Sequence, residues 1–175
     1  MQRRKKKLHE GTASPLFLYL KMFRKLVEDL LAKALEERKD LFLISFKISE
    51  TNEIKIEIDG DLGVLVEDCV FVSRAIEHNI ARDQYDFSLE VTSAGALSPL
   101  VNSRQYVKNK GRHLKVTHQD GEVFKGVLTD VLDNAIVLEW KAREPKPIGK
   151  GKITVNKSIN IEFELVKEAV VEIKF

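Results

Sequence analysis

The sequence predicts an α+β protein made of an N-terminal αββαβ two-layer sandwich and a small C-terminal β-barrel of the SH3 or Sm type. In the N-terminal half, segments with a helical apolar period alternate with segments of strand period, whereas the C-terminal half has only short alternating segments and tight turns. Charge is divided at the same place. Residues 22–100 are acidic, with 9 Lys or Arg and 16 Asp or Glu, and residues 101–175 are basic, with 14 Lys or Arg and 10 Asp or Glu. The expected units are an N-terminal domain over 22–98, a helical connection over 99–110 and a barrel over 111–175.

The first 21 residues have no apolar periodicity and hold six Lys or Arg against one Glu. Five of these cations form the run RRKKK, from Arg3 to Lys7. Such a run is typical of a nucleic-acid arm or of a disordered leader. We predict a leader, because the first packed residue of the apolar pattern that follows is near Phe23.

The N-terminal domain is expected to contain two amphipathic helices and three strands. Apolar residues at spacings of three and four indicate the helices, and strict alternation of apolar and polar residues indicates the strands. Two such helices can bury their apolar faces only against one face of a three-stranded sheet, which predicts a two-layer sandwich. The expected helices are Phe23–Leu35 and about Val66–Arg82, and the expected strands are Ile44–Ile48, Ile54–Ile58 and Tyr85–Thr92.

The C-terminal domain is expected to consist of about five short strands. Asp120-Gly121 lies between two apolar segments and is a strong signal for a two-residue hairpin, and Asp133-Asn134 is a weaker one. Five strands in so short a segment are too few for a sandwich. A small closed barrel removes the exposed sheet edges, so we predict that the strands close on themselves.

The stretch LEVTSAGALSPL, from Leu89 to Leu100, marks the boundary between the two domains. The strand stops at the small residues that begin with Ser93, and Gly95 can take positive φ or let another group approach its backbone closely. Ser98 and Pro99 predict an N-cap followed by the first residue of a short helix. These four residues, Ser93, Gly95, Ser98 and Pro99, form the predicted domain-junction motif.

No candidate catalytic or metal site meets the requirements of its chemistry. Ser93 lies on a strand-to-helix turn, but a nucleophile elbow needs glycine two residues earlier, where Val91 stands. A single cysteine and four scattered histidines give no zinc spacing. The loop Asp59-Gly60-Asp61 lacks the later ligands of an EF-hand, and the GxxG of a KH domain would join two helices instead of following a strand. We therefore predict no catalytic residue, no metal and no cofactor.

Two basic stretches in the C-terminal half predict contact with phosphate groups. The first has no acidic residue between Val101 and Gln119, and the second is a Pro- and Gly-rich segment, expected to be a loop, in which Glu144 is the one acid. Lys and Arg bind nucleic-acid phosphates with release of counterions. Few aromatic residues are available to stack on bases, so recognition of RNA shape and backbone is expected. The predicted RNA- or ribosome-binding residues are Arg104, Lys108, Lys110, Arg112, Lys146, Lys150 and Lys152.

The composition is typical of a soluble globular protein, with 43% hydrophobic and 32% charged residues. The longest apolar run, near Leu41 to Ile44, is far shorter than the roughly 18 residues that a membrane span needs, and no apolar signal-peptide segment follows the N-terminal charges. One cysteine cannot form an internal disulfide. These features predict a cytoplasmic protein with no membrane contact, and we expect a monomer.

Three groups of motifs carry a family resemblance. They are LEVTSAGALSPL at 89–100 followed by Tyr106 and GRHLKV at 111–116, IEIDG at 56–60 followed by VEDCVFVSRAIE at 66–77, and FELVKEAVVEIKF at 163–175. Together they resemble the bacterial ribosome maturation factor RimP family. Three positions depart from the family pattern, which commonly has proline, an acidic residue and arginine where Ala94, Leu97 and Ser98 stand. The resemblance covers roughly residues 22–175.

The resemblance implies a maturation factor that associates with the free 30S ribosomal subunit during its assembly and catalyses no reaction. Its implied partners are 16S rRNA and a basic small-subunit ribosomal protein. An acidic domain joined to a basic one suits two partners of opposite charge. An alternative from another class is an Sm-like RNA-binding module that acts outside the ribosome, and an enzyme is the third possibility.

Overall fold

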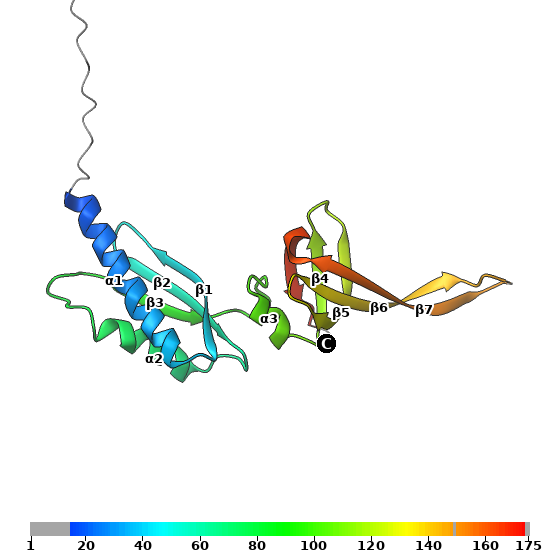
Figure 1. The fold of residues 1–175 in the computed structure, drawn as a ribbon, viewed down its shortest axis with the longest axis horizontal. Helices are drawn as coiled ribbons and strands as arrows, with labels where there is room; N and C mark the ends of the chain where they lie inside the picture. Colours follow the sequence, from blue (N-terminus) through cyan, green and yellow to red (C-terminus); the bar gives the residue numbers. More distant parts are fainter. Residues whose placement is uncertain (1–14, 149, 174–175) are drawn as a thin grey trace, which may run out of the picture.

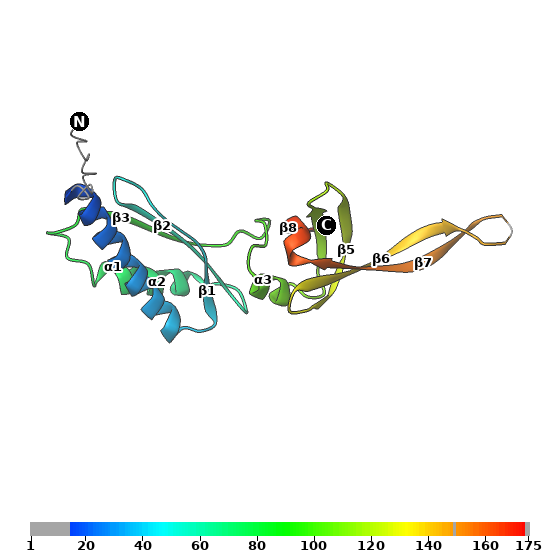
Figure 2. The same ribbon diagram turned by 45° about the horizontal axis from the view of Figure 1, so that its top comes forward.

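The computed structural model describes residues 15–148 and 150–173. Its N-terminal and C-terminal parts lie end to end along the long axis, and a β-hairpin extends from the C-terminal part away from the rest of the molecule (Figure 1). Figure 2 shows the same arrangement after a turn about that axis. The RRKKK run predicted to be a leader lies outside the described residues.

The N-terminal part has the predicted order of helix, two strands, helix and strand. β1 and β2 are antiparallel, β2 and β3 are parallel, and β2 is the central strand. Both helices lie on the same face of the sheet (Figures 1 and 2). This arrangement confirms the predicted mixed α/β order of this half. The elements are α1 (Pro15–Glu37), β1 (Leu41–Ile48), β2 (Glu53–Gly60), α2 (Val66–Glu77) and β3 (Ser88–Ser93).

The core of this part lies between the two helices and β2. The inward-facing residues of β2 are Ile54, Ile56 and Ile58, none of which is more than 1% exposed. Because successive side chains of a strand point to opposite faces, the alternate residues of β2 face away from the helices. The helices contribute Phe23, Val27 and Leu31 from α1 and Val72 and Ile76 from α2.

Helix α1 begins at Pro15, eight residues earlier than the predicted Phe23. Tyr19 stacks on Tyr85 with a distance of 5.2 Å between ring centroids, and its hydroxyl donates to the Gln84 carbonyl at 3.1 Å. The expected leader of 21 residues therefore includes the first two turns of this helix. Helix α2 ends at Glu77 rather than near Arg82.

The C-terminal part contains a short helix and a five-stranded antiparallel sheet in the order β7-β6-β5-β4-β8. The hairpin predicted at Asp120-Gly121 is present, but its loop has three residues instead of two. The His118 amide donates to the Glu122 carbonyl at 2.8 Å and the Gly121 amide donates to the His118 carbonyl at 3.0 Å, so residues 119–121 form the loop. Gly121 has a positive φ, +94°, and Asp120 does not, whereas a two-residue turn of this kind needs positive φ at both. Asp133 and Asn134 lie in the turn between β5 and β6. The elements are α3 (Ser103–Lys108), β4 (His113–His118), β5 (Val123–Val131), β6 (Ala135–Pro145), β7 (Lys152–Glu162), the 3-10 helix η1 (Phe163–Leu165) and β8 (Val166–Val171).

The closed barrel expected from the sequence is not found. The terminal strands of the sheet, β7 and β8, are not paired with each other within the described residues. After β7 the chain turns through η1 and pairs with β4, so β8 occupies the opposite edge of the sheet. Along part of β8 the Leu100 amide donates to the Ala169 carbonyl at 2.8 Å. At Ala169 this edge therefore pairs with the connection between the domains, and within the described residues it does not pair with β7.

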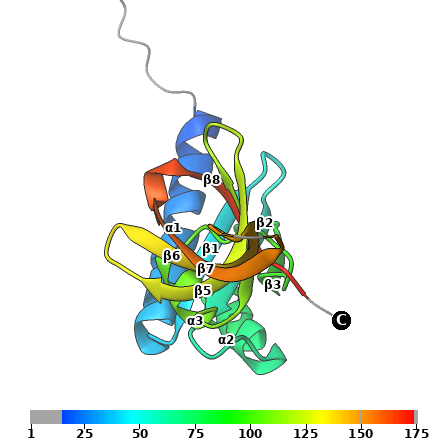
Figure 3. The ribbon, with the colours of Figure 1, turned by 90° about the vertical axis from the view of Figure 1, so that its right-hand side faces the viewer.

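The long basic segment expected to be a loop is mostly strand. β6 and β7 pair continuously from Ala135 with Glu162 to Pro145 with Lys152, whereas β5 pairs with β6 only as far as Glu139. Among the described residues, the distal half of this hairpin therefore has no third strand beside it. Figure 3 looks along the long axis from the end where the hairpin projects. No helix in the described part of the chain is long and apolar enough to cross a membrane.

Candidate functional site

The predicted domain-junction motif forms a turn and an extended connection, and the helix starts later than expected. The Ser98 amide donates to the Gly95 carbonyl at 2.9 Å, which closes a turn immediately after β3. Ser98 and Pro99 do not start a helix. The prediction failed because a better capping pair lies four residues further along, at Asn102 and Gln105.

Asn102 is the N-cap of α3. Its side chain accepts a hydrogen bond from the Arg104 amide at 2.9 Å. The Gln105 side chain accepts from the amides of Val101 and Asn102 at 2.8 and 3.1 Å. This reciprocal capping satisfies amides that would otherwise have no partner at the start of the helix. The capping orients α3 so that Arg104, Gln105 and Lys108 reach the N-terminal part.

Gly95 does not take the positive φ that was one of its two predicted roles. The other role, close approach of a neighbouring group, fits its surroundings. A Cβ atom at Gly95 would lie 2.8 Å from the Ser98 hydroxyl oxygen. Glycine therefore makes room for the Ser98 side chain within the turn.

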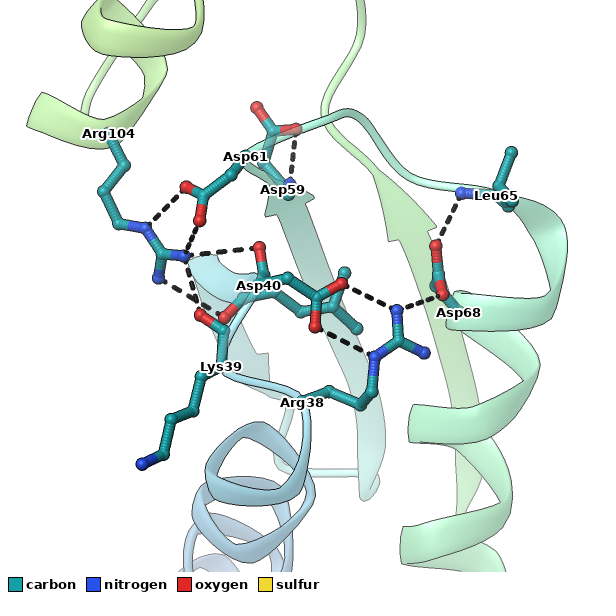
Figure 4. Close-up of polar contacts among 10 residues, drawn as sticks. Arg38, Lys39, Asp40, Asp59, Asp61, Leu65, Asp68 and Arg104 are labelled. Carbon is teal, nitrogen blue, oxygen red and sulfur yellow. Dashed lines mark hydrogen bonds and ion pairs between the residues drawn. The ribbon is translucent and has the colours of Figure 1, made fainter.

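Arg104 of α3 binds the N-terminal part through both a carboxylate and the backbone (Figure 4). Its Nε and Nη2 donate to the two carboxylate oxygens of Asp61 at 2.9 and 2.6 Å. Nη2 also donates to the Lys39 carbonyl at 2.7 Å, and the guanidinium lies over the Phe42 ring, 4.3 Å from its centroid. Such planar, bidentate and stacked recognition is available to arginine and not to lysine.

Lys108, one turn further along α3, forms an ion pair with Asp59 at the end of β2. Its Nζ lies 2.5 and 2.6 Å from the two carboxylate oxygens. Asp59 is 4% exposed, and it also accepts hydrogen bonds from the Gln105 side chain at 3.1 Å and the Gly60 amide at 2.7 Å. A buried carboxylate is tolerated when several donors surround it in this way.

A second arginine continues the charged network inside the N-terminal part. Arg38 donates to both carboxylate oxygens of Asp40 at 2.9 and 2.8 Å and to Asp68 at 2.8 Å (Figure 4). Asp68 in turn accepts from the Leu65 amide at 2.8 Å, which caps α2. The hydrogen bonds from Arg38 hold the pKa of Asp40 below its usual value. The network thus connects the start of α2 with the loop that Arg104 binds.

The charges at the junction stabilise one another. Hydrogen bonding to Arg104 lowers the pKa of Asp61, and the same contact raises the pKa of Arg104. Both groups therefore stay charged at neutral pH. α3 is consequently held to the N-terminal part by two cations, which contact Asp59 at the end of β2 and Asp61 just after it.

The structure divides the seven predicted RNA- or ribosome-binding residues into groups with different surroundings. Arg104 and Lys108 contact the N-terminal part, as described above. Lys110 pairs with Asp130 at 2.7 Å within the C-terminal part. Arg112 lines a cleft of about 450 Å³ at the junction, together with residues of both parts. Lys146, Lys150 and Lys152 are exposed near the tip of the projecting hairpin.

Sequence reasoning missed the partners of Arg104 and Lys108. The local motif around Asp59 and Asp61 suggests only calcium ligands or a GxxG loop, but the structure directs both carboxylates to cations of α3. No cluster of three or more potential metal-ligating side chains occurs among the residues described. Complementary charge was the one feature of the sequence that could have indicated these contacts. Acidic residues precede the junction, and the basic residues of α3 follow it.

Comparison with known proteins identifies relatives over most of the chain. Residues 30–97 match the family described as RimP N-terminal domain. A protein of Christiangramia forsetii named "Ribosome maturation factor RimP" is 51% identical over 154 residues, which are 88% of this chain and 100% of the relative. A protein of the same name from Flavobacterium psychrophilum is 44% identical over 87% of this chain and 99% of the relative. Another, from Porphyromonas gingivalis, is 36% identical over 75% of this chain and 86% of the relative. The resemblance proposed from the sequence motifs is confirmed, and the chain belongs to the ribosome maturation factor RimP family.

Proposed function

We propose that this protein is a ribosome maturation factor that binds the free 30S subunit during its assembly in the cytoplasm and catalyses no reaction. The observation that carries the proposal is the similarity to proteins named ribosome maturation factors over 88% of the chain, which spans both parts of the molecule. The division of charge between the two parts adds a physical reason. A ribosomal particle offers both polyanionic RNA and basic proteins, and each attracts the part of opposite charge.

The basic C-terminal part is proposed to contact 16S rRNA. Arg112, Lys146, Lys150 and Lys152 are the predicted residues best placed to reach phosphates, because Arg104 and Lys108 already contact carboxylates at the junction. Lys110 can exchange its exposed partner, since surface ion pairs contribute little. Arg104 and Lys108 contribute to ribosome binding by fixing the position of the basic part relative to the acidic part.

The acidic N-terminal part is proposed to contact a basic small-subunit ribosomal protein. Bare RNA repels a surface with an excess of carboxylates. A photocrosslinking residue in place of Glu67, which is exposed on α2, should therefore crosslink to protein in purified 30S particles. Crosslinks to rRNA from that position would contradict this division of partners.

Sedimentation of cell extract through a density gradient tests the function itself. The protein should sediment with 30S particles and be absent from 70S ribosomes. An Sm-like module that acts outside the ribosome would sediment elsewhere, with its RNA or free. Sedimentation with 70S ribosomes, or at the top of the gradient only, would contradict the proposed function.

A further inference from the structure

The distal half of the β6-β7 hairpin is a two-stranded arm that carries a concentration of positive charge. The arm, residues 140–157, begins where β6 loses its pairing with β5, next to Glu139. It contains six Lys or Arg and one Glu. It extends away from the other strands in both side views (Figures 1 and 2). An extended and highly charged ribbon of this kind has no role in the hydrophobic core of the sheet.

The pairing register of the arm separates its side chains into two chemically different faces. Paired residues of antiparallel strands lie on the same face, and alternate residues lie on opposite faces. The register pairs Lys141 with Asn156, Arg143 with Thr154 and Pro145 with Lys152. All six of these residues are exposed, and three are cations. We call the surface formed by Lys141, Arg143, Pro145, Lys152, Thr154 and Asn156 the cationic face.

The opposite face of the arm has a different composition. Ala142 is paired with Val155, and Glu144 with Ile153, and all four are partly buried. The remaining cation on this face, Lys157, forms an ion pair with Glu144. Glu144 and Lys157 therefore add no net charge to the opposite face. The cationic face contains no carboxylate, so the uncompensated charge of the paired strands lies on that face.

We propose that the cationic face binds double-helical RNA along its backbone. Lys141 and Arg143 are two residues apart on one strand, so their side chains leave the ribbon about 7 Å apart and can bind separate phosphates. On the paired strand, Asn156 lies opposite Lys141 and Thr154 lies opposite Arg143. Both side chains can donate to phosphate oxygens or 2′-hydroxyls. This inference rests on the proposed function and specifies which RNA structure the basic part contacts and through which surface.

The absence of aromatic residues favours a duplex over a single strand. Proteins that bind single-stranded RNA without sequence preference stack bases on aromatic side chains, and the cationic face has none. Trp140, the one aromatic residue of the arm, lies on the opposite face, and its ring centroid is 6.5 Å from that of Phe124. Backbone and 2′-hydroxyl contacts across a helical surface are the mode by which proteins recognise double-stranded RNA.

The arm provides a matched control for the experiment that tests this proposal. The full chain would be titrated with a fluorescent RNA duplex of about 20 base pairs at several salt concentrations. Each lost phosphate contact should reduce the slope of log K against log salt by roughly 0.9, so the variant K141Q/R143Q/K152Q should reduce it by about 2 to 3. The control Lys157→Gln removes a cation from the opposite face of the arm, and it should leave the slope unchanged.

Three outcomes would overturn the proposal. The first is an unchanged slope of log K against log salt in the triple variant. The second is a reduction of the slope in K157Q as large as that in the triple variant. The third is equal affinity of the wild type for the duplex and for a single-stranded oligouridine of the same length. Equal far-UV circular dichroism and melting temperature would show that the variants fold, which is expected since all three substituted side chains are exposed. Sedimentation of the wild-type chain with 30S particles tests the proposed function independently of the proposal that the cationic face binds duplex RNA. If the wild type associates but the triple variant retains full duplex binding, the arm assignment fails and the proposed function stands.

Discussion

Arg104 and Asp61 join the two halves of the molecule, with Nε to Oδ1 at 2.9 Å and Nη2 to Oδ2 at 2.6 Å, although they are 43 residues apart in the chain. The same guanidinium also donates to the Lys39 carbonyl and lies over the Phe42 ring. A side chain with this many partners in the other domain determines how the domains are oriented.

Replacing Arg104 should loosen the junction without unfolding either domain. In Arg104→Ala the guanidinium contacts with Asp61, Lys39 and Phe42 are lost, while the cores of both parts are unchanged. Limited proteolysis should cut the connection at residues 94–102 several times faster than in the wild type. Arg104→Lys should also be cut faster, because an ammonium cannot make the bidentate and stacked contacts.

Lys110→Gln is the matched control for this experiment. Its ion pair with Asp130 lies within the C-terminal part and does not cross the junction. The variant should be cut at the wild-type rate. A wild-type rate for Arg104→Ala as well would show that Arg104 does not hold the domains together.

Lys108→Met should destabilise the protein more than the Arg104 variants do. The substitution leaves the Asp59 carboxylate buried and without its ammonium partner, which costs about 2 kcal/mol in the free energy of unfolding. The double variant K108M/D59N should recover part of that loss, because the buried charge is then removed as well. Denaturant unfolding of the two single variants and the double variant measures the coupling. Additive effects would contradict a direct interaction of this pair.

The Asp61 carboxyl group should titrate below its ordinary range, and this shift should depend on Arg104. Hydrogen bonding to Arg104 lowers its pKa in the folded protein, so the interaction contributes stability above the unfolded-state pKa of about 3.9. That contribution is lost as pH falls through the folded-state pKa. NMR titration of the side-chain carboxyl should show a midpoint below about 3.9 in the wild type. In Arg104→Ala the midpoint should rise toward the ordinary aspartate value, and a midpoint that does not move would contradict this cause of the shift.

Substitution of two glycines should have unequal effects. At Gly95 an added Cβ meets the Ser98 hydroxyl, which can rotate away, so Gly95→Ala should cost less than about 1 kcal/mol. At Gly60 the added Cβ would collide with the backbone carbonyl of Gly63, which cannot move without shifting the loop that carries Asp61. Gly60→Ala should therefore cost about 2 kcal/mol or more. Thermal unfolding of both variants gives the comparison, and equal melting temperatures would contradict it.

Tyr19 should contribute to stability, although it lies within the segment predicted to be a leader. Tyr19→Ala removes the stacking on Tyr85 and the hydrogen bond to the Gln84 carbonyl, and it should lower the free energy of unfolding by about 1 kcal/mol. Deletion of residues 1–14 leaves these contacts in place and should not change the melting temperature or 30S association. A loss of 30S association on that deletion would show that the RRKKK run binds the particle.

Periodicity was sufficient to predict the element order of the N-terminal part. A helix with an apolar stripe and a strand with one buried face are local patterns, and the buried Ile54, Ile56 and Ile58 stand two residues apart as a strand face requires. The hairpin at Asp120-Gly121 was predicted for the same reason, although its loop has three residues instead of the two expected. The sequence by itself therefore determines the features that depend on residues close together in the chain.

The partners of the basic residues and the closure of the C-terminal sheet depend on contacts between distant segments. A lysine in the sequence carries the same charge whether it will meet a phosphate or a carboxylate. Lys108 was predicted to bind RNA, but folding brings Asp59 next to it from 49 residues away. Alternation along β6 likewise does not show where its neighbour β5 ends, so the sequence could not distinguish a closed barrel from an open sheet with a projecting arm. These outcomes were set by long-range packing, because the free energy of an ion pair or of a strand edge depends on the groups that the fold places beside it.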